Sequence, residues 1–428
     1  MRATIYLVVI GLALVSPYLG KYSGIPFAII AASGFATQSL KWYPSDSTRR
    51  EIVTIALAAC GIAVMGSFLP LPDFVITASI LTVIVGDMGA RVTKTVMNKG
   101  SSRRDRVIRH ERKHELANYS AFISVGGIAG ILGGLFVPLP TSGFETVALT
   151  VLTGVFVAGI TRSLLFERDT ALVLLTTAVA MWGITVLGAD VGLIPIVVGL
   201  VVAVSFGLAS YLVNAATVSG ALSGILTGFV AITVGGYIWF VLLLIFFVLG
   251  SSSTRFKYEE KLNLGIAEEN KGARGFTNVM GNGLIALVAV LLYSAGSFPV
   301  VAKVLFAASI ATATADTLSS EIGCVYGKPR LITTLKKVPR GTDGAVSWQG
   351  EVMVILSALL IGGSAVLLGF VGPEIGALVA VGGVIGAHVD SVLGATLEDK
   401  VLTNSSVNLA ACLSGAVVSA VLYIYLLG

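Results

Sequence analysis

The sequence predicts an all-α, polytopic integral membrane protein with about fifteen transmembrane helices and a cytoplasmic N-terminus. Of its 428 residues, 55% are hydrophobic, only 12% are charged and 50 are glycine, which is far from the composition of soluble domains. Apolar runs of about 17–23 residues recur along the whole chain, and about 20 such residues suffice to cross a bilayer as a helix. These two observations predict the fold class.

The expected helices follow the apolar runs in chain order. They cover residues 3–20, 24–40, 52–70, 73–92, 118–138, 143–165, 170–188, 191–213, 217–235, 236–250, 276–297, 299–315, 352–371, 374–395 and 405–427. The first run follows Arg2 and lacks a small-residue cleavage site, so we interpret it as a retained helix and not as a signal peptide.

The positive charges predict the orientation of these helices. With a cytoplasmic N-terminus, 26 of the 28 Lys and Arg residues fall at the N-terminus or in loops after even-numbered helices, and only Lys21 and Lys303 do not. Cytoplasmic loops of membrane proteins carry such an excess. The net charge of +5 therefore indicates topology and contact with anionic membrane lipids, and no nucleic acid is expected as a partner.

Two parts of the chain differ in character. Residues 1–213 form an N-terminal membrane domain of about eight helices, to which the sequence assigns no role. Residues 214–428 carry longer cytoplasmic loops, at 251–275, 316–350 and 396–405, with polar residues at the helix ends. We therefore expect the chemistry in the second part, in a cell membrane with the active site on the cytoplasmic side.

Three acidic residues of the second part adjoin or interrupt apolar runs. Asp316 and Glu321 follow the run 299–315, and Asp390 lies inside the run 374–395. Ionisable groups at membrane depth are costly and tend to mark function.

These acids suggest a catalytic metal site. Mg²⁺ is commonly bound by one or two carboxylates together with substrate phosphates, so Asp316 and Asp390 are the predicted ligands. Glu321 would support them from another helix face, since five residues rotate a helix position by about 140°. An ion pair with Lys328 or Arg330 is the structural alternative for these acids.

A basic loop with a glycine turn follows the first two acids. Its candidate nucleotide- and phosphate-binding residues are Lys328, Arg330, Lys336, Arg340, Gly341, Thr342, Asp343, Gly344 and Ser347. Backbone amides in such a turn can form an anion-binding nest. The alternative is that the cations only mark a cytoplasmic loop.

A second polar group leads into the run 276–297. Arg274, Asn278 and Asn282 lie at its start, and Asn inside a membrane helix needs a hydrogen-bonding partner. A phosphate or lipid head group is one candidate, and an Asn–Asn contact beside a solvated loop is the other. Together, the polar groups predict a metal-assisted phosphate site at a membrane surface, acting on a phosphorylated lipid.

Five motifs of residues 214–428, in order, resemble the phytyl-phosphate kinase family. They are the segment LGSSSTRFKYEEKLNLGIAEENKGARGFTNVMGNG, then ADTLSSEIG, KPRLITT with VPRGTDGAVS, VDSVLGATLE, and NSSVN. The resemblance places Asp316, Ser320 and Glu321 in an acidic signature and Asp390 in the last one. It places the residues from Lys328 to Ser347 in the phosphate-binding loop and Arg274, Asn278 and Asn282 in the first motif.

This resemblance implies a Mg²⁺-dependent kinase. It would transfer a phosphoryl group from a nucleoside triphosphate, with CTP as the expected donor, to an isoprenoid monophosphate such as phytyl or geranylgeranyl phosphate. A CTP-dependent lipid cytidylyltransferase and an ion-coupled transporter are the alternatives, and a homo-oligomer is possible.

Overall fold

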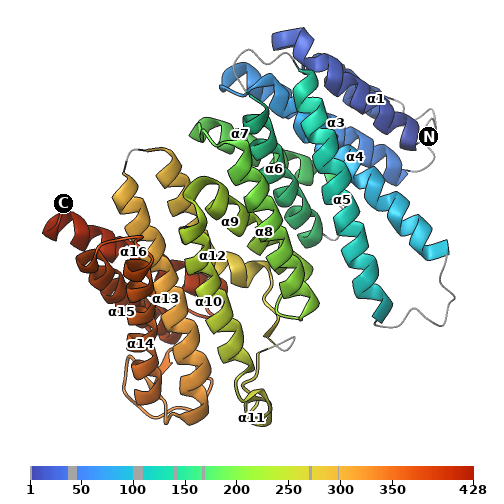
Figure 1. The fold of residues 1–428 in the computed structure, drawn as a ribbon. Coiled ribbons are helices and arrows are strands. Elements are labelled where there is room, and N and C mark those ends of the chain that lie inside the picture. Colours follow the sequence, from blue (N-terminus) through green and yellow to red (C-terminus); the bar gives the residue numbers. More distant parts are fainter. Residues whose placement is uncertain are drawn as a thin grey trace. The chain divides into compact units, whose positions relative to one another are not determined.

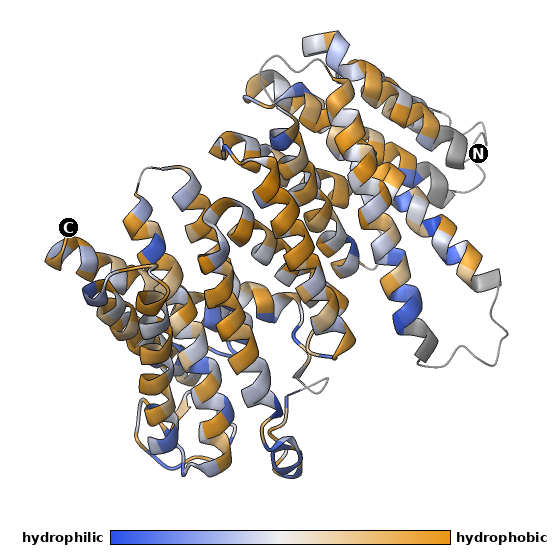
Figure 2. Cartoon of the chain, viewed as in Figure 1, coloured by the Kyte–Doolittle hydropathy of each residue, from blue (hydrophilic) through white to orange (hydrophobic). Residues whose placement is uncertain are grey.

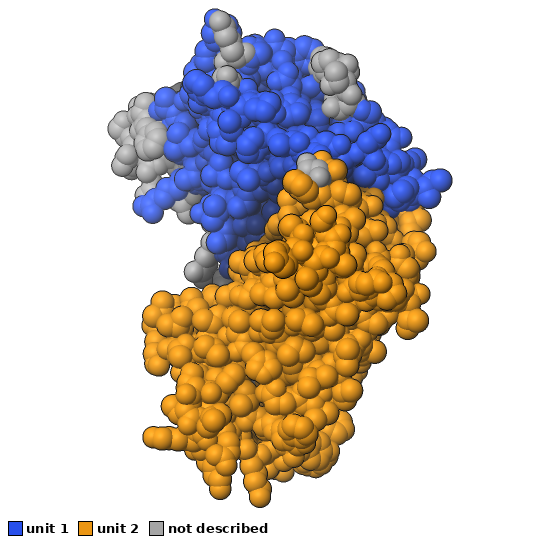
Figure 3. Space-filling model, turned by 90° about the vertical axis from the view of Figure 1, so that its left-hand side faces the viewer, with its two compact units in different colours: residues 1–196 blue, residues 197–428 orange. Residues whose placement is uncertain are grey.

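The computed structural model describes residues 2–36, 46–99, 109–137, 143–165, 169–268, 272–296 and 298–428. The chain divides into two compact units, residues 1–196 and 197–428 (Figure 3). The division between the two units falls inside the helix Leu193–Leu212. The boundary expected from the sequence, where the loops become longer and more polar, lies near residue 213, just after this helix.

The first unit is built of helices, most of which are labelled in Figure 1. They are α1 (Arg2–Val15), the 3-10 helix η1 (Ser16–Tyr22), α2 (Ile25–Ala36), α3 (Asp46–Phe68), α4 (Asp73–Lys99), α5 (Arg109–Phe136), α6 (Phe144–Leu164) and α7 (Thr170–Leu187); α8 (Leu193–Leu212) leads into the second unit.

The second unit is also helical, with one short hairpin. Its elements are α9 (Val218–Val230) with its π-helical continuation η3 (Ala231–Gly235), α10 (Tyr237–Arg255), α11 (Tyr258–Asn263), α12 (Phe276–Ser294), α13 (Pro299–Tyr326), the strands β1 (Arg330–Leu331) and β2 (Ala345–Val346), α14 (Trp348–Leu367), α15 (Pro373–Thr396) and α16 (Asn404–Leu426). The two strands pair antiparallel, with Arg330 opposite Val346.

The predicted fold class is confirmed, because each of the fifteen expected spans coincides with a helix. Within the described residues, twelve helices are long and apolar enough to cross a membrane, and two further apolar helices, Tyr6–Gly20 and Ile25–Gly34, are shorter. Several spans were predicted too short. Helix α3 begins at Asp46 and α5 at Arg109, α4 continues to Lys99, and α13 does not end at residue 315 but continues to Tyr326. The orientation stays a prediction, and some of its cations, including Lys41 and Lys271, lie outside the described residues.

Glycines allow the helices of the first unit to pack closely. A Cβ atom on Gly126 of α5 would lie 2.4 Å from the Thr82 carbonyl oxygen of α4, and one on Gly86 would lie 2.9 Å from that of Phe122. Only glycine fits such contacts, and small residues are the usual means of helix association in membranes.

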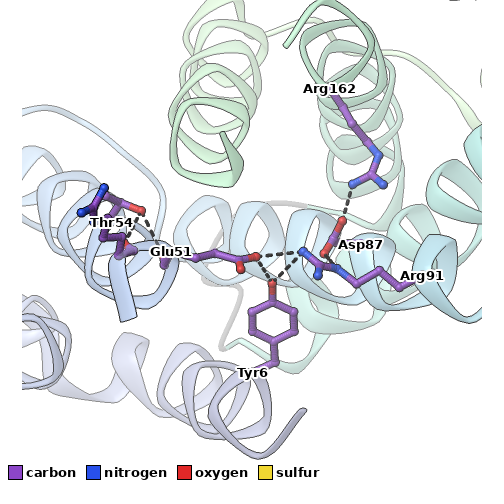
Figure 4. Close-up of polar contacts among 7 residues, drawn as sticks. Tyr6, Glu51, Thr54, Asp87, Arg91 and Arg162 are labelled. Carbon is purple, nitrogen blue, oxygen red and sulfur yellow. Dashed lines mark hydrogen bonds and ion pairs between the residues drawn. The ribbon is translucent and has the colours of Figure 1, made fainter. Parts of the chain in front are cut away.

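A polar network balances the buried charges of the first unit (Figure 4). Asp87 is 3% exposed and accepts hydrogen bonds from both Arg91 and Arg162. Arg91 also donates to Glu51 over 2.8 Å, and the Tyr6 hydroxyl donates to the same carboxylate over 2.5 Å. Two carboxylates thus face two guanidinium groups, which limits the cost of placing them inside a helix bundle.

Helix α13 forms the centre of the second unit. Its sequence from Ala307 to Ala315 consists of small and hydroxyl residues with one Ile, and all of them are buried. Gly383 and Gly386 of α15 pack directly on it, because added Cβ atoms would lie 2.8 Å from Ala311 and 2.4 Å from Thr312. This close packing brings the polar C-terminal half of α13 beside α15.

Three loops of the second unit meet at one end of its helices. Figure 1 shows α11 and the hairpin segment at this end, and Figure 2 shows hydrophilic residues gathered there. A Cβ atom on Gly341 would lie 2.7 Å from Ile266, and one on Gly344 would lie 2.3 Å from the Ser391 carbonyl oxygen. The segments after α10, α13 and α15 therefore converge, as expected for loops on one side of a membrane.

Candidate active site

A cavity of about 210 Å³ lies at this end of the second unit. Residues of α13, the hairpin segment, α14, α15 and α16 line it. The lining includes five acidic side chains, Asp316, Asp343, Glu351, Asp390 and Glu398, together with His388, Asn404 and Asn408. No Lys or Arg of the described residues lines the cavity, so its polar surface is strongly acidic.

Asp316 and Asp390 form the centre of this group. They come from α13 and α15, and their carboxyl groups lie within hydrogen-bonding reach of each other. The side-chain amide of Asn408 satisfies its neighbours when its nitrogen faces Asp390 and its oxygen faces Asn282. In this orientation it donates to Asp390 over 3.3 Å and accepts from Asn282 over 3.2 Å. Two carboxylates this close repel each other when both are ionised, and a bound cation would remove that repulsion.

Two further acids lie where α15 ends. Burial, and then the neighbouring Asp343 carboxylate, raise the pKa of Glu398 above its ordinary value. Burial, and then Asp399, raise the pKa of Asp343 in the same way. On the other side of the cavity, His388 Nε2 lies 3.1 Å from Glu351 Oε2. The cavity therefore concentrates acidic groups from four separate elements.

The glycine turn forms one wall of the cavity. Gly341 and Gly344 have φ angles of +79° and +68°, which favour glycine over residues with a side chain. Within the described part of the chain, the backbone amides of residues 341–344 donate no hydrogen bond, so they are available to an anionic ligand. Ser347, also predicted here, caps α14 by accepting from the Gly350 amide over 3.2 Å.

The cations of the same loop lie outside the cavity lining. Arg330 donates to the Leu335 carbonyl and Arg340 to the Val325 carbonyl, both over 2.8 Å, so both hold the loop in shape. Lys328 and Lys336 are exposed. The structure thus brings the glycine turn, but not the four cations, to the acidic cavity.

Glu321 lies apart from the two aspartates. Its carboxylate pairs over 2.5 Å with Lys261, which is only 1% exposed and also donates to the Ser253 carbonyl over 2.9 Å. Asp316 and Glu321 diverge around one helix, so Glu321 pairs with Lys261 and does not join the two aspartates that it was expected to support. The partner of Glu321 is Lys261 of α11, and not Lys328 or Arg330.

The third predicted group adjoins a second cavity. Arg274 is 8% exposed and donates to Asn278 Oδ1 over 2.7 Å, and Asn282 donates to the Asn278 carbonyl over 3.0 Å. Arg274 and Asn278 line an apolar cavity of about 70 Å³. Asn282 connects this group to Asp390 through Asn408.

Sequence reasoning did not select several of these residues. Glu351 and His388 stand in apolar helices without a motif, and Lys261 is one cation among several in its loop. The closeness of Glu398 and Asn408 to the aspartates depends on how α15 and α16 pack. A signal for Glu351 was available in the sequence, because this acid directly precedes the apolar run 352–371.

The acidic cavity fits a divalent cation that is shared with a phosphorylated ligand. Among the described residues, no three His, Cys, Asp or Glu side chains are grouped to hold a metal ion by themselves. Two carboxylates completed by phosphate oxygens are the usual arrangement for Mg²⁺. Asp316 and Asp390 would supply those carboxylates.

Comparison with known proteins places this site in a family. Residues 201–416 match the family described as integral membrane protein DUF92. The chain is 32% identical over 225 residues to Protein VTE6, chloroplastic, of Arabidopsis thaliana, covering 50% of this chain and 68% of that protein. It is 37% identical over 206 residues to an uncharacterized membrane protein of Methanocaldococcus jannaschii, covering 48% of this chain and 84% of the relative.

A more distant relative is Protein PGR of Arabidopsis thaliana, 27% identical over 205 residues, with 41% of this chain and 71% of that protein covered. No solved structure matches the chain. The family match lies within the second unit, which holds both cavities, and confirms the family resemblance predicted from the motifs of residues 214–428. The chain therefore belongs to the integral membrane protein family DUF92.

Proposed function

We propose that this protein is a membrane kinase that converts an isoprenoid monophosphate into the diphosphate at the expense of a nucleoside triphosphate. The observation that carries the proposal is the acidic cavity, in which the Asp316–Asp390 pair faces the glycine turn of residues 341–344. The motif resemblance to phytyl-phosphate kinases supplies the substrate class, with phytyl or geranylgeranyl phosphate as acceptor and CTP as donor.

An acidic cavity can accept a triphosphate only when cations offset the charge. Mg²⁺, when bound, would offset the negative charge of the phosphate groups. Asp316 and Asp390 would hold it, and the available amides of Gly341, Thr342 and Gly344 would bind phosphate oxygens. The exposed Lys328 and Lys336 would neutralise that part of the triphosphate which extends beyond the cavity.

Little covalent chemistry is then required of the protein. An oxygen of the acceptor monophosphate attacks the γ-phosphorus, the bond from this phosphorus to the β–γ bridging oxygen breaks, and the nucleoside diphosphate leaves. Because the attacking oxygen is already anionic, no general base is needed, and positioning and charge neutralisation dominate. Arg274, Asn278 and Asn282 would orient the acceptor phosphate. The segments after α10, α13 and α15 converge at this site and are the loops predicted to be cytoplasmic, so the reaction would take place on the cytoplasmic face.

The nucleotide product tests the proposal. Detergent-purified protein is incubated with Mg²⁺, CTP and geranylgeranyl monophosphate, and both the nucleotide and the lipid products are separated. Prenyl diphosphate with an equal amount of CDP supports the kinase. Pyrophosphate with a CDP-linked lipid would assign the chain to the cytidylyltransferases, which attack the α-phosphorus. No turnover with any nucleotide by folded protein would contradict both and turn attention to ion-coupled transport.

A further inference from the structure

The second cavity of the second unit is apolar, and a buried charge is part of its lining. Helices α8, α9, α10 and α12 enclose it, and its volume is about 70 Å³. Its walls consist mainly of aromatic side chains and of glycines. The aromatic residues are Phe206, Phe240, Phe246 and Phe247, and the glycines are Gly207, Gly220, Gly224, Gly228 and Gly283.

The buried charge is the Arg274 guanidinium. It donates to Asn278 and lies over the Phe246 ring, 5.6 Å from the ring centroid, but Nε has no acceptor. No carboxylate of the described residues lies within salt-bridge distance of it. Glu268, Glu321 and Asp316 act on this charge only from a greater distance. A buried charge without a partner in direct contact is costly, so an anionic ligand that binds at the free Nε would stabilise the site.

The backbone holds Arg274 in this position. Its amide donates to the Ala215 carbonyl over 2.9 Å, and its carbonyl accepts from the Thr217 amide over 3.0 Å. A Cβ atom on Gly250 would lie 2.6 Å from Arg274 Nη2 and 3.5 Å from the Thr317 methyl group. The guanidinium therefore lies between the apolar cavity and the helix turn that carries Asp316.

From these contacts we infer that the apolar cavity binds the hydrocarbon chain of a lipid monophosphate, next to a phosphate that Arg274 binds. The inference rests on the proposed kinase function and assigns the residues that recognise its acceptor. A single unbranched or methyl-branched chain fits an apolar cavity lined by rings and glycines, and the monophosphate matches a buried guanidinium whose Nε has no acceptor. The small volume means that the cavity holds only the part of the chain nearest the phosphate.

Two of the lining glycines offer a direct test. At Gly224 and Gly283, an added Cβ atom would have no neighbouring atom within 4 Å, whereas at Gly220 it would lie 1.9 Å from the Arg274 carbonyl oxygen. A side chain at residue 224 thus fills the cavity without displacing the backbone. Gly363 of α14 also has open space around its Cβ position and lines neither cavity, so it provides the matched control.

The experiment measures equilibrium binding of radiolabelled geranylgeranyl monophosphate to the detergent-purified full chain, without nucleotide or Mg²⁺. Gly224→Leu should weaken binding by about tenfold or more, a change of about 1.4 kcal/mol, and Gly363→Leu should leave the Kd unchanged. Arg274→Met, if it folds, should weaken binding of the phosphate ester but not of the corresponding prenyl alcohol. Wild-type affinity in Gly224→Leu, or no binding by the wild-type protein, would overturn the inference.

The two proposals fail in different ways. Wild-type protein that binds the lipid monophosphate but forms no diphosphate would contradict the kinase and leave the binding site in place. Wild-type protein that forms the diphosphate, with an unchanged acceptor KM in Gly224→Leu, would contradict the binding site and leave the kinase in place.

Discussion

Asp316 of α13 and Asp390 of α15 place their carboxyl groups within hydrogen-bonding reach of each other, in a cavity that no Lys or Arg of the described residues lines. Each stands inside a helix of membrane-spanning length. Asn408 of α16 donates to Asp390 and links the pair to Asn282 of α12. A site of this kind requires a cation before it accepts a polyphosphate, and the following predictions depend on that requirement.

Asp316→Asn or Asp390→Asn should lower kcat by about 100-fold or more, because each removes a carboxylate that would hold the cation, and this cation would stabilise the transferred phosphoryl group. The thermal midpoint should not fall, since the change also relieves repulsion between the pair. Glu374→Gln, at the exposed start of α15, is the control and should retain wild-type turnover. Wild-type turnover in either aspartate variant would rule out this pair as the metal site.

Gly344→Ala should reduce kcat/KM by about 10- to 100-fold, because small displacements of positioning groups have effects of this size. The added methyl group would lie 2.3 Å from the Ser391 carbonyl oxygen, and the φ angle of +68° is unfavourable for alanine. The turn would therefore move away from α15. Steady-state kinetics check this, with Gly363→Ala as the control. Unchanged kinetics in Gly344→Ala would show that the turn does not contribute to binding.

Replacing one partner of the Lys261–Glu321 pair should destabilise the protein by about 3–5 kcal/mol, because the other charge stays buried and unpaired. The double variant Lys261→Met/Glu321→Met should recover much of this loss. Thermal unfolding in detergent measures both. A Glu321→Gln protein of normal stability that has lost turnover would contradict the structural role and favour the catalytic role predicted from the sequence.

Asp87→Ala should destabilise the first unit by a similar amount, about 3–5 kcal/mol. Arg91 and Arg162 would then face each other without the carboxylate that both contact. Asp190→Ala, at an exposed position of the same unit, should have little effect on the unfolding midpoint. Equal midpoints for the two variants would mean that the network does not stabilise the unit.

Binding of Mg²⁺ should strengthen as the pH rises. The pKa values of Asp343 and Glu398 are raised in the folded state, so these groups ionise above their ordinary range of about 4. Without Mg²⁺, stability should fall as the pH rises from the unfolded-state values to the raised ones, because only the unfolded state has lost these protons. The gain in thermal midpoint on adding Mg²⁺ should therefore be larger at about pH 8 than at about pH 5.

Asp399→Asn tests the smaller of the two causes of the Asp343 shift. Burial, the larger cause, raises the pKa of Asp343 in both proteins, whereas the variant removes the like charge of Asp399 that raises it further. Asn tolerates the positive φ of 59° at this position. The pH dependence of the Mg²⁺ effect should move to lower pH. A Mg²⁺ effect that does not depend on pH would show that the charges of Asp343 and Glu398 do not strengthen cation binding in the cavity that they line.

The helices could be predicted from sequence because membrane spans are long apolar runs. The ends of the helices were harder to predict, and α13 is an example. Its C-terminal half contains several polar residues, yet the helix continues there because it packs against α14 and α15. The two aspartates and the glycine turn were predicted because charges and glycines are unusual beside apolar runs.

The partners of these residues could not be predicted, because they depend on packing between distant segments. Lys261 and Glu321 meet only because α11 folds back beside α13. The apolar cavity around Gly224 and Gly283 arises from the placement of four helices, and no local pattern in the sequence indicates it.

The most direct test of the central claim follows the γ-phosphorus of CTP. Purified protein is given Mg²⁺, geranylgeranyl monophosphate and CTP labelled with ³²P at the γ position, and the label is located after separation of the lipid and aqueous phases. We predict that the label appears in prenyl diphosphate with the wild-type protein and not with Asp390→Asn. Label released as pyrophosphate, or equal transfer by the two proteins, would contradict phosphoryl transfer at the Asp316–Asp390 site.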